Sequence, residues 1–163
     1  RDGYAYIRDQ TLRLASLGHT PREIADMLTL PEALRTSFSN RGYYGTLKHN
    51  AKAVYQMYFG WYDGNPARLK PASDQVLAAE LASLAGGTLA LAERASTLMT
   101  RDIRLACHLV ELAVQSDPLN QAAHEIRAAI YQHRRNQETS LMAKGIYGAA
   151  ANESNALISD GRP

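Results

Sequence analysis

Residues 105–136 read LACHLVELAVQSDPLNQAAHEIRAAIYQHRRN, and this stretch decides the fold class. Apolar residues recur every three or four positions on both sides of the segment SDPLN, which is the spacing of two amphipathic helices joined by a turn. Small side chains let packed helices approach closely, and we expect them to do so here at Ala106, Ala113, Ala123 and Ala129.

The same periodicity extends through most of the chain, with almost no alternation of the kind found in strands. Helices are predicted over residues 2–17, 20–30, 31–37, 46–59, 73–84, 88–99, 102–115 and 120–134, and the tail after 138 starts helical and then loses its pattern. The fold class is therefore all-α, a multi-helical array of antiparallel helix hairpins. The turn and helix after residue 116 resemble one tetratricopeptide-like layer, and only one such step is clear.

The segment HTPREIADML carries the sharpest local signal. Thr20 is predicted as an N-cap, Pro21 as the first helical residue, and Glu23 as the partner that closes a capping box. Two helix faces are also expected to be buried. They are Tyr4, Ile7, Thr11, Leu14 and Leu17 on the first helix, and Leu47, Ala51, Val54 and Tyr58 on the helix 46–59.

Composition excludes several classes of function. The 163 residues carry a formal charge of +2 without a long basic run, so no nucleic-acid surface is predicted. Cys107 is the single cysteine, which excludes a disulfide framework and a thiolate zinc site. No segment predicts a membrane span or a signal peptide. The compartment stays open between export to the periplasm or medium and the cytoplasm.

Catalytic motifs are also absent from the sequence. There is no HExxH, no P-loop and no GxSxG. Cys107 and His108 are not a nucleophile pair, because neighbours on a helix point about 100° apart. Structural roles are therefore expected for His108, His124 and His133.

An aromatic block, RGYYGTLKHNAKAVYQMYFGWYDGNP, occupies residues 41–66. Its glycine-framed loop leads into a helix, and free backbone N–H groups at a helix N-terminus favour an anion. Arg41 and Tyr43 lie in the loop, and His49 and Asn50 follow one turn into the helix. These residues predict an oxyanion site, for sulfate or phosphate, whereas the competing interpretation assigns the aromatics to a core or an interface.

Three segments together resemble the helical dimerisation domain of the alkyl sulfatases. They are RDGYAYIRDQTLRLASLGHTPREIADMLTLP, RGYYGTLKHNAKAVYQMYFGWYDGNPARLKP and LVELAVQSDPLNQAAHEIRAAIYQ, in order and with similar spacing. The resemblance covers residues 1–135. It implies a dimerisation domain at residues 1–137, followed at 138–163 by a C-terminal helix and a connector toward a further domain.

The resemblance implies a parent enzyme that hydrolyses linear primary alkyl sulfates, such as dodecyl sulfate, to alcohol and sulfate. Two zinc ions are expected in an N-terminal metallo-β-lactamase-type domain of the parent, with no cofactor or metal in this fragment. The fragment would supply the homodimer interface and part of the substrate cleft. By the match, His49 faces the sulfate, with Arg41, Tyr43, Asn50 and Trp61 as neighbours.

Two other functions compete with this one. A tetratricopeptide-like adaptor would be a monomer with a groove for an extended peptide. A small enzyme acting through His49 ranks last, because His49 has no paired base in the sequence. The fragment alone is predicted to be catalytically inactive, and it is expected to be a piece of a longer protein because it lacks an initiator Met.

Overall fold

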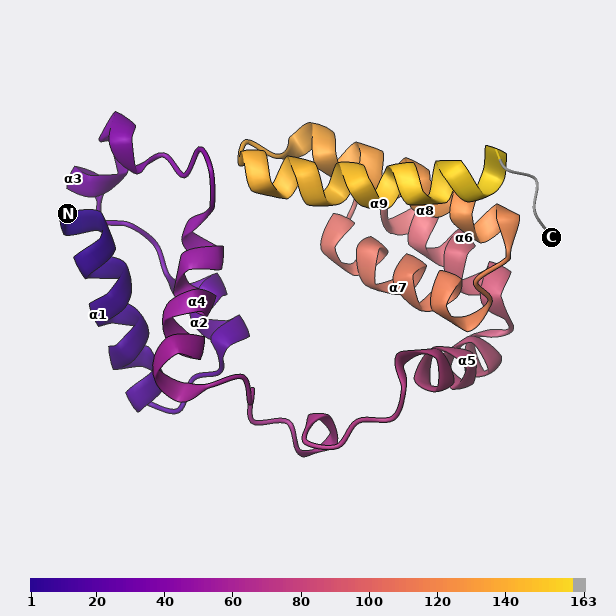
Figure 1. The fold of residues 1–163 in the computed structure, drawn as a ribbon, viewed down its shortest axis with the longest axis horizontal. Helices are drawn as coiled ribbons and strands as arrows, with labels where there is room; N and C mark the ends of the chain where they lie inside the picture. The colour runs from indigo at the N-terminus through magenta and orange to yellow at the C-terminus, as the bar shows by residue number, and fades with distance from the viewer. Residues whose placement is uncertain (160–163) are drawn as a thin grey trace. The chain divides into compact units, whose positions relative to one another are not determined.

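The computed structural model describes residues 1–159, and within them it contains nine α-helices and no strand. The predicted all-α class is therefore confirmed. The chain forms two compact units (Figure 1). The N-terminal unit comprises residues 1–71 with 139–142, and the C-terminal unit comprises residues 72–138 with 143–159. The predicted domain boundary at residue 137 stays a prediction.

The N-terminal unit is built from α1 and α2 packed against α4. Short helices connect these three. The bounds are α1 Asp2–Ser16, α2 Pro21–Met27, α3 Glu32–Arg35, the 3₁₀ turn η1 Phe38–Asn40, α4 Leu47–Phe59 and the 3₁₀ turn η2 Pro66–Arg68. The bounds of α1 to α4 lie within a few residues of the predicted helices, whereas the 3₁₀ turns η1 and η2 were not predicted.

The start of α2 confirms the predicted capping box. The Thr20 hydroxyl accepts a hydrogen bond from the Glu23 N–H, and the Glu23 carboxylate accepts one from the Thr20 N–H at 2.8 Å. Two N–H groups that the helix leaves unpaired are satisfied in this way. The hydrogen bond from the Thr20 N–H lowers the pKa of Glu23 below its ordinary value, and the Thr20 hydroxyl adds to this by donating to the same carboxylate at 2.9 Å.

The core of the N-terminal unit consists of Ile7, Leu14, Ile24, Leu28 and Ala51. The predicted face of α1 was wrong at both ends, because Tyr4 is 75% exposed and Leu17 is 66% exposed. The predicted inner face of α4 was wrong at Tyr58, which is 53% exposed.

The C-terminal unit is a bundle in which α7 packs against α5, α6 and α8. Its bounds are α5 Asp74–Ala85, α6 Thr88–Leu98, α7 Ile103–Ser116, α8 Gln121–Gln137 and α9 Leu141–Ser159, whose first two residues belong to the N-terminal unit. No single helix of residues 1–159 is long and apolar enough to cross a membrane. The bent pair α5 and α6 meets that test of length and composition jointly.

Small residues pack the C-terminal unit, as the sequence predicted for three of four positions. Ala106, Ala113 and Ala123 are fully buried. The prediction was wrong for Ala129, which is exposed, because the register of α8 turns Ala128 inward instead. The packing of α7 against α8 confirms the helical hairpin, while its likeness to a tetratricopeptide repeat stays a prediction.

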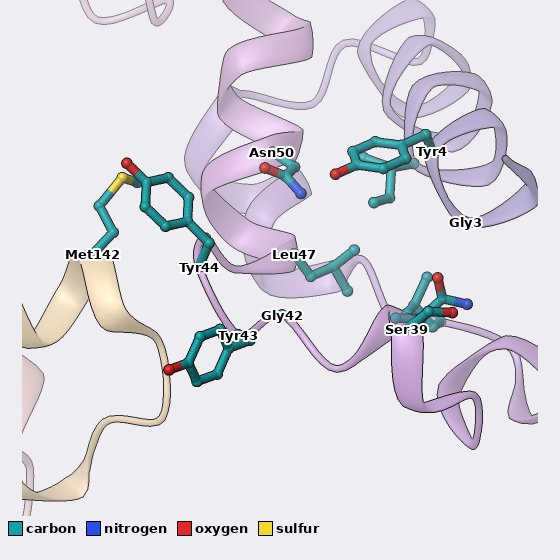
Figure 2. Close-up of a pocket in the computed structure, with 13 residues that line it drawn as sticks. Gly3, Tyr4, Ser39, Gly42, Tyr43, Tyr44, Leu47, Asn50 and Met142 are labelled. Carbon is teal, nitrogen blue, oxygen red and sulfur yellow. The ribbon is translucent and has the colours of Figure 1, made fainter.

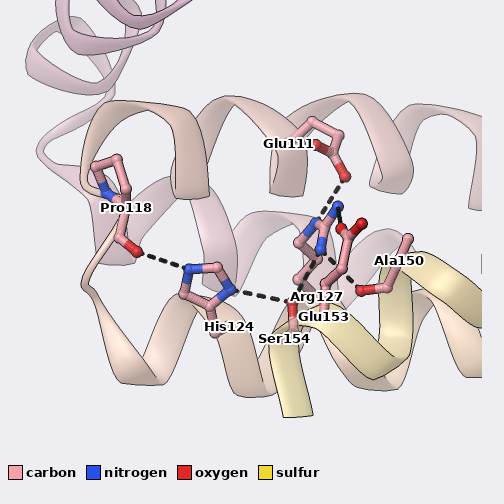
Figure 3. Close-up of polar contacts among 7 residues, drawn as sticks. All are labelled: Glu111, Pro118, His124, Arg127, Ala150, Glu153 and Ser154. Atoms are coloured by element: carbon pink, nitrogen blue, oxygen red, sulfur yellow. Dashed lines mark hydrogen bonds and ion pairs between the residues drawn. The ribbon is translucent and has the colours of Figure 1, made fainter. Parts of the chain in front are cut away.

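A buried polar network joins α7, α8 and α9 (Figure 3). Arg127 donates to Glu111 at 2.8 Å, to the Ala150 carbonyl oxygen at 2.8 Å and to the Ser154 hydroxyl at 3.0 Å. His124 Nε2 donates to the Pro118 carbonyl at 2.9 Å, which leaves Nδ1 to accept from Ser154 at 3.0 Å. His124 is therefore structural, as predicted.

Helix α9 is longer than the sequence pattern indicated. It stays helical to Ser159, although the apolar periodicity of its second half is weak. Two small residues of α9, Gly148 and Ala151, are buried, and Ala151 packs in a cluster with Ile130 and Tyr131 of α8. A Cβ at Gly148 would come within 3.2 Å of Arg135, and Tyr147 stacks on Tyr131 with ring centroids 5.8 Å apart. Residues 160–163 of the predicted connector lie outside the described residues.

Candidate functional site in the N-terminal unit

A hollow of about 420 Å³ lies in the N-terminal unit between α1, η1, the loop 42–45 and the start of α4 (Figure 2). Its volume falls within the range of about 300–1,000 Å³ typical of ligand pockets. Apolar side chains come from Ile7, Leu30, Leu47 and Met142. Neutral polar side chains come from Ser39, Asn40, Asn50 and the tyrosines Tyr4, Tyr43 and Tyr44.

The loop beside the hollow depends on Gly42. Its φ of +67° lies in the left-handed region, and a Cβ there would come within 3.1 Å of the Gly45 carbonyl oxygen. After the loop, Thr46 caps α4, because its hydroxyl accepts a hydrogen bond from the His49 N–H at 3.2 Å. The glycine-framed loop that leads into a helix is therefore present as predicted.

The loop is also held by residues almost a hundred positions away. The Leu141 N–H donates to the Tyr43 carbonyl at 2.8 Å, and the Met142 N–H donates to the Tyr44 carbonyl at 3.1 Å. The buried Ser140 hydroxyl donates to the same Tyr44 carbonyl at 2.6 Å. The first N–H groups of α9 are thus paired by loop carbonyls, and these bonds fix the backbone that carries both tyrosines.

Two of the predicted site residues line this hollow. Tyr43 does so from the loop and Asn50 from the first turn of α4 (Figure 2). Arg41 lies beside them, with its guanidinium 3.8 Å from the Phe38 ring centroid and 5.2 Å from that of Tyr43. Arg41 thus stacks on two aromatic rings, which is a geometry that guanidinium groups favour.

The other two predicted residues lie apart from the hollow. His49 is not among the residues that line it, and this side chain is half-buried. Its Nδ1 is buried without a hydrogen-bond partner among residues 1–159. Trp61 lines a second, smaller hollow of about 210 Å³ in the same unit, beside Lys52, Tyr55 and Arg22. The structure therefore does not gather all five predicted residues into one site.

Sequence reasoning missed several residues of the site. Tyr4 was assigned to a buried face, although it lines the hollow while staying largely exposed. Asn40 approaches α1 so closely that a Cβ at Gly3 would lie 2.9 Å from its side-chain oxygen. Met142 and Ser140 come from the far end of the chain, and no local signal in the sequence connects them to the loop.

Two charged side chains near the two hollows have ion-pair partners. Lys48 in the first turn of α4 pairs with Asp26 of α2. Beside the second hollow, Asp63 accepts a hydrogen bond from the Asn65 N–H and pairs with Arg68, and both effects lower the pKa of Asp63. Elsewhere in the chain, burial raises the pKa of the Cys107 thiol, which weakens it as a nucleophile.

Within residues 1–159, no group of three or more His, Cys, Asp or Glu side chains lies close enough together to hold a metal ion.

Comparison with known proteins identifies the family. The family described as alkyl sulfatase dimerisation matches residues 20–156. The chain belongs to this family. That result agrees with the resemblance carried by the aromatic block and by the helices around it.

Whole alkylsulfatases contain stretches similar to this dimerisation domain. The alkyl/aryl-sulfatase BDS1 of Saccharomyces cerevisiae is 45% identical over 129 residues, which are 78% of this chain and 20% of that protein. A linear primary-alkylsulfatase from a Pseudomonas species is 43% identical over 129 residues, 78% of this chain and 19% of that protein. The solved structure of the stereoselective inverting sec-alkylsulfatase Pisa1 from Pseudomonas has a TM-score of 0.90 and 32% identity, covering 100% of this chain and 25% of that one.

This chain therefore spans about a fifth to a quarter of the length of the relatives and structures that it matches.

Proposed function

We propose that this chain is the dimerisation domain of a zinc-dependent alkyl sulfatase and supplies its homodimer interface. The parent would hydrolyse linear alkyl sulfates to alcohol and sulfate, as the names of the similar proteins suggest. The comparisons do not favour the adaptor function, because the family match covers residues 20–156 and its members are not named as adaptors.

One observation carries the interface proposal. The N-terminal unit leaves large apolar side chains exposed, and Phe38 is 75%, Met57 80% and Trp61 66% accessible. Aromatic residues and methionine are enriched at interfaces between proteins. A second copy of the chain would bury them, and a stable homodimer interface buries on the order of 2,000 Å² or more.

The substrate cleft is the second part of the proposal. His49, Arg41, Tyr43, Asn50 and Trp61 would contribute to it from the N-terminal unit. Arg41 would supply positive charge, and the unpaired Nδ1 of His49 would gain a hydrogen-bond partner. The zinc ions would bind in another part of the parent, since residues 1–159 offer no ligand cluster. The fragment alone is accordingly proposed to be inactive.

The solution mass tests the interface. Light scattering across a tenfold concentration range should give a stable mass near twice 17.9 kDa. Met57→Ser, on the exposed face of α4, should shift the equilibrium toward monomer. Leu84→Ser serves as the matched control, because Leu84 is 77% exposed on α5 of the C-terminal unit. A monomer at every concentration would contradict the proposal that this chain carries a sufficient interface.

Catalysis by the fragment is a separate measurement. The metal-free chain is expected to release no sulfate from octyl sulfate. Measured turnover by the purified chain would overturn the assignment of catalysis to another part of the parent.

A further inference from the structure

The hollow beside the loop 42–45 contains no charged side chain. None of the residues that line it is an Asp, Glu, Lys, Arg or His. Moving an anion from water into a site without a cation costs several kcal/mol. The guanidinium of Arg41 stacks on the Phe38 and Tyr43 rings and is not part of this lining.

The lining instead combines apolar walls with neutral polar side chains, among them the Asn50 amide. Ile7, Leu30 and Leu47 form a wall at the edge of the core of this unit, and Met142 adds a flexible thioether side chain. Asn50 faces Tyr4 across the hollow (Figure 2), and its side-chain amide makes no hydrogen bond within residues 1–159. An amide both donates and accepts, which matches a hydroxyl group.

The Asn40 amide is less available than that of Asn50. Its nitrogen donates to the Leu34 carbonyl at 3.0 Å, and its oxygen lies against Gly3. Asn50 is thus the polar side chain of the first turn of α4 that is free to bind a ligand in the hollow.

We propose that this hollow binds an uncharged alkyl alcohol, with its hydroxyl on the Asn50 amide and its alkyl chain against Ile7, Leu30, Leu47 and Met142. The inference rests on the proposed function, because an alkyl alcohol is what remains when the sulfate group leaves an alkyl sulfate. It divides the proposed cleft into a neutral pocket for the alcohol and a charged part near Arg41. The pocket would hold the product apart from the sulfate, rather than bind the sulfate itself.

The four methionines provide site-specific probes. The chain is labelled with ¹³C at the methionine methyl groups and titrated with octan-1-ol by NMR. Met142 lines the hollow, whereas Met27, Met57 and Met99 do not. The expected result is a saturable shift of the Met142 methyl signal, with the other three unchanged, and a weaker effect for octyl sulfate at the same concentration.

Two variants test the assigned contacts. Asn50→Leu keeps the size of the side chain and should weaken octanol binding about 3- to 10-fold, the range for one hydrogen bond. Gln56→Leu is the matched control on the same helix, since Gln56 lines the other hollow. Tyr4→Ala should also weaken binding, and it leaves the core intact because Tyr4 is mostly exposed. Tyr58→Ala, on the exposed part of α4, should not.

The outcomes separate this inference from the proposed function. Equal shifts at all four methyl groups, tighter binding of octyl sulfate than of octanol at Met142, or an unchanged affinity in Asn50→Leu would each overturn it. Light scattering on the same samples reports the homodimer independently. If the chain is a dimer and octanol does not shift the Met142 signal, the proposed pocket is wrong and the proposed interface is not. If the chain is a monomer and octanol shifts the Met142 signal, the proposed interface is wrong and the proposed pocket is not.

Discussion

The two units of this chain handle their aromatic residues in opposite ways. Of twelve aromatic side chains (nine Tyr, two Phe and one Trp), ten lie in residues 1–71 and two, Tyr131 and Tyr147, in the C-terminal unit. Those two stack on each other, and Tyr131 is 8% exposed. In the N-terminal unit, by contrast, Tyr4, Phe38 and Trp61 are each at least 66% exposed.

The two units also differ in how much of their interior is packed. The C-terminal unit fills its interior with fully buried small residues, among them Ala92, Ala95 and Ala106, and joins three helices through Arg127. The N-terminal unit has one small cluster around Ile24 and leaves much of its apolar surface open. The C-terminal unit also exposes apolar side chains, such as Leu84 at 77%, but its two aromatic residues pack on each other. The N-terminal unit, by contrast, presents aromatic surface to a partner or a ligand.

The largest expected effect sharpens this contrast. Ile130→Ala removes a fully buried side chain from the core of the C-terminal unit, and we expect it to lower the free energy of unfolding by about 2–5 kcal/mol. Phe38→Ala removes a larger side chain that is 75% exposed, and should change it by less than about 0.5 kcal/mol in the monomer. Urea denaturation measures both. If the two variants lose similar amounts of free energy of unfolding, the exposed fraction of a side chain does not predict its contribution to stability in this chain.

Arg127→Ala should have the next largest effect. It leaves the partly buried Glu111 carboxylate without its ion pair and removes a donor from the Ala150 carbonyl oxygen. We expect a loss of about 2–3 kcal/mol in the free energy of unfolding. The control is Arg94→Ala, at an exposed position on α6. If both variants unfold at the same urea concentration, the network does not stabilise the bundle.

Ser140→Ala tests whether the N-terminal unit also contains a rigid part. The variant loses the hydrogen bond to the Tyr44 carbonyl, at an expected cost of about 1 kcal/mol. Amide hydrogen exchange should quicken at Leu141 and Met142, whose N–H groups donate to the loop. Ser159→Ala, at the exposed end of α9, is the control. Unchanged exchange at both amides would show that Ser140 does not hold the loop.

The smallest effect concerns pH. Hydrogen bonds from Thr20 lower the pKa of Glu23, so its ionised form contributes stability above the ordinary value of 4.5, and this contribution is lost as the pH falls through the lowered folded pKa. The wild type should exceed Glu23→Gln in stability at pH 6, and the difference should shrink below pH 4.5. Thermal unfolding from pH 6 to pH 3 measures it. The exposed control Glu93→Gln should show no such trend, and a difference that grows toward acid would contradict the assignment.

Local signals made much of the fold predictable. The capping box at Thr20 and Glu23 needs residues only three apart, and the structure forms it as expected. Register was harder to predict, because Ala128 and Ala129 are equally small and only the packing partner decides which one turns inward. Tyr58 has the right spacing for the inner face of α4, yet no neighbour covers it.

The site was less predictable for a physical reason. Tyr43 and Asn50 could be placed together because one turn of helix and one loop connect them. The contacts of Ser140 and Met142 with the same loop depend on tertiary packing, which leaves no pattern in the sequence. His49 also shows the limit of spacing arguments, since its position off the apolar face did not predict a buried Nδ1.

The tie between the loop and the start of α9 has a consequence for synthesis on the ribosome. The helices α1, α2 and α4 can form once residue 59 has emerged. The carbonyls of Tyr43 and Tyr44 can accept their hydrogen bonds only after Leu141 and Met142 have been synthesised. At about 5–20 residues per second, this interval lasts roughly 4–16 seconds. During this time the aromatic loop lacks the hydrogen bonds that hold it. The nascent N-terminal unit is therefore accessible to chaperones and proteases until the last helix begins to emerge.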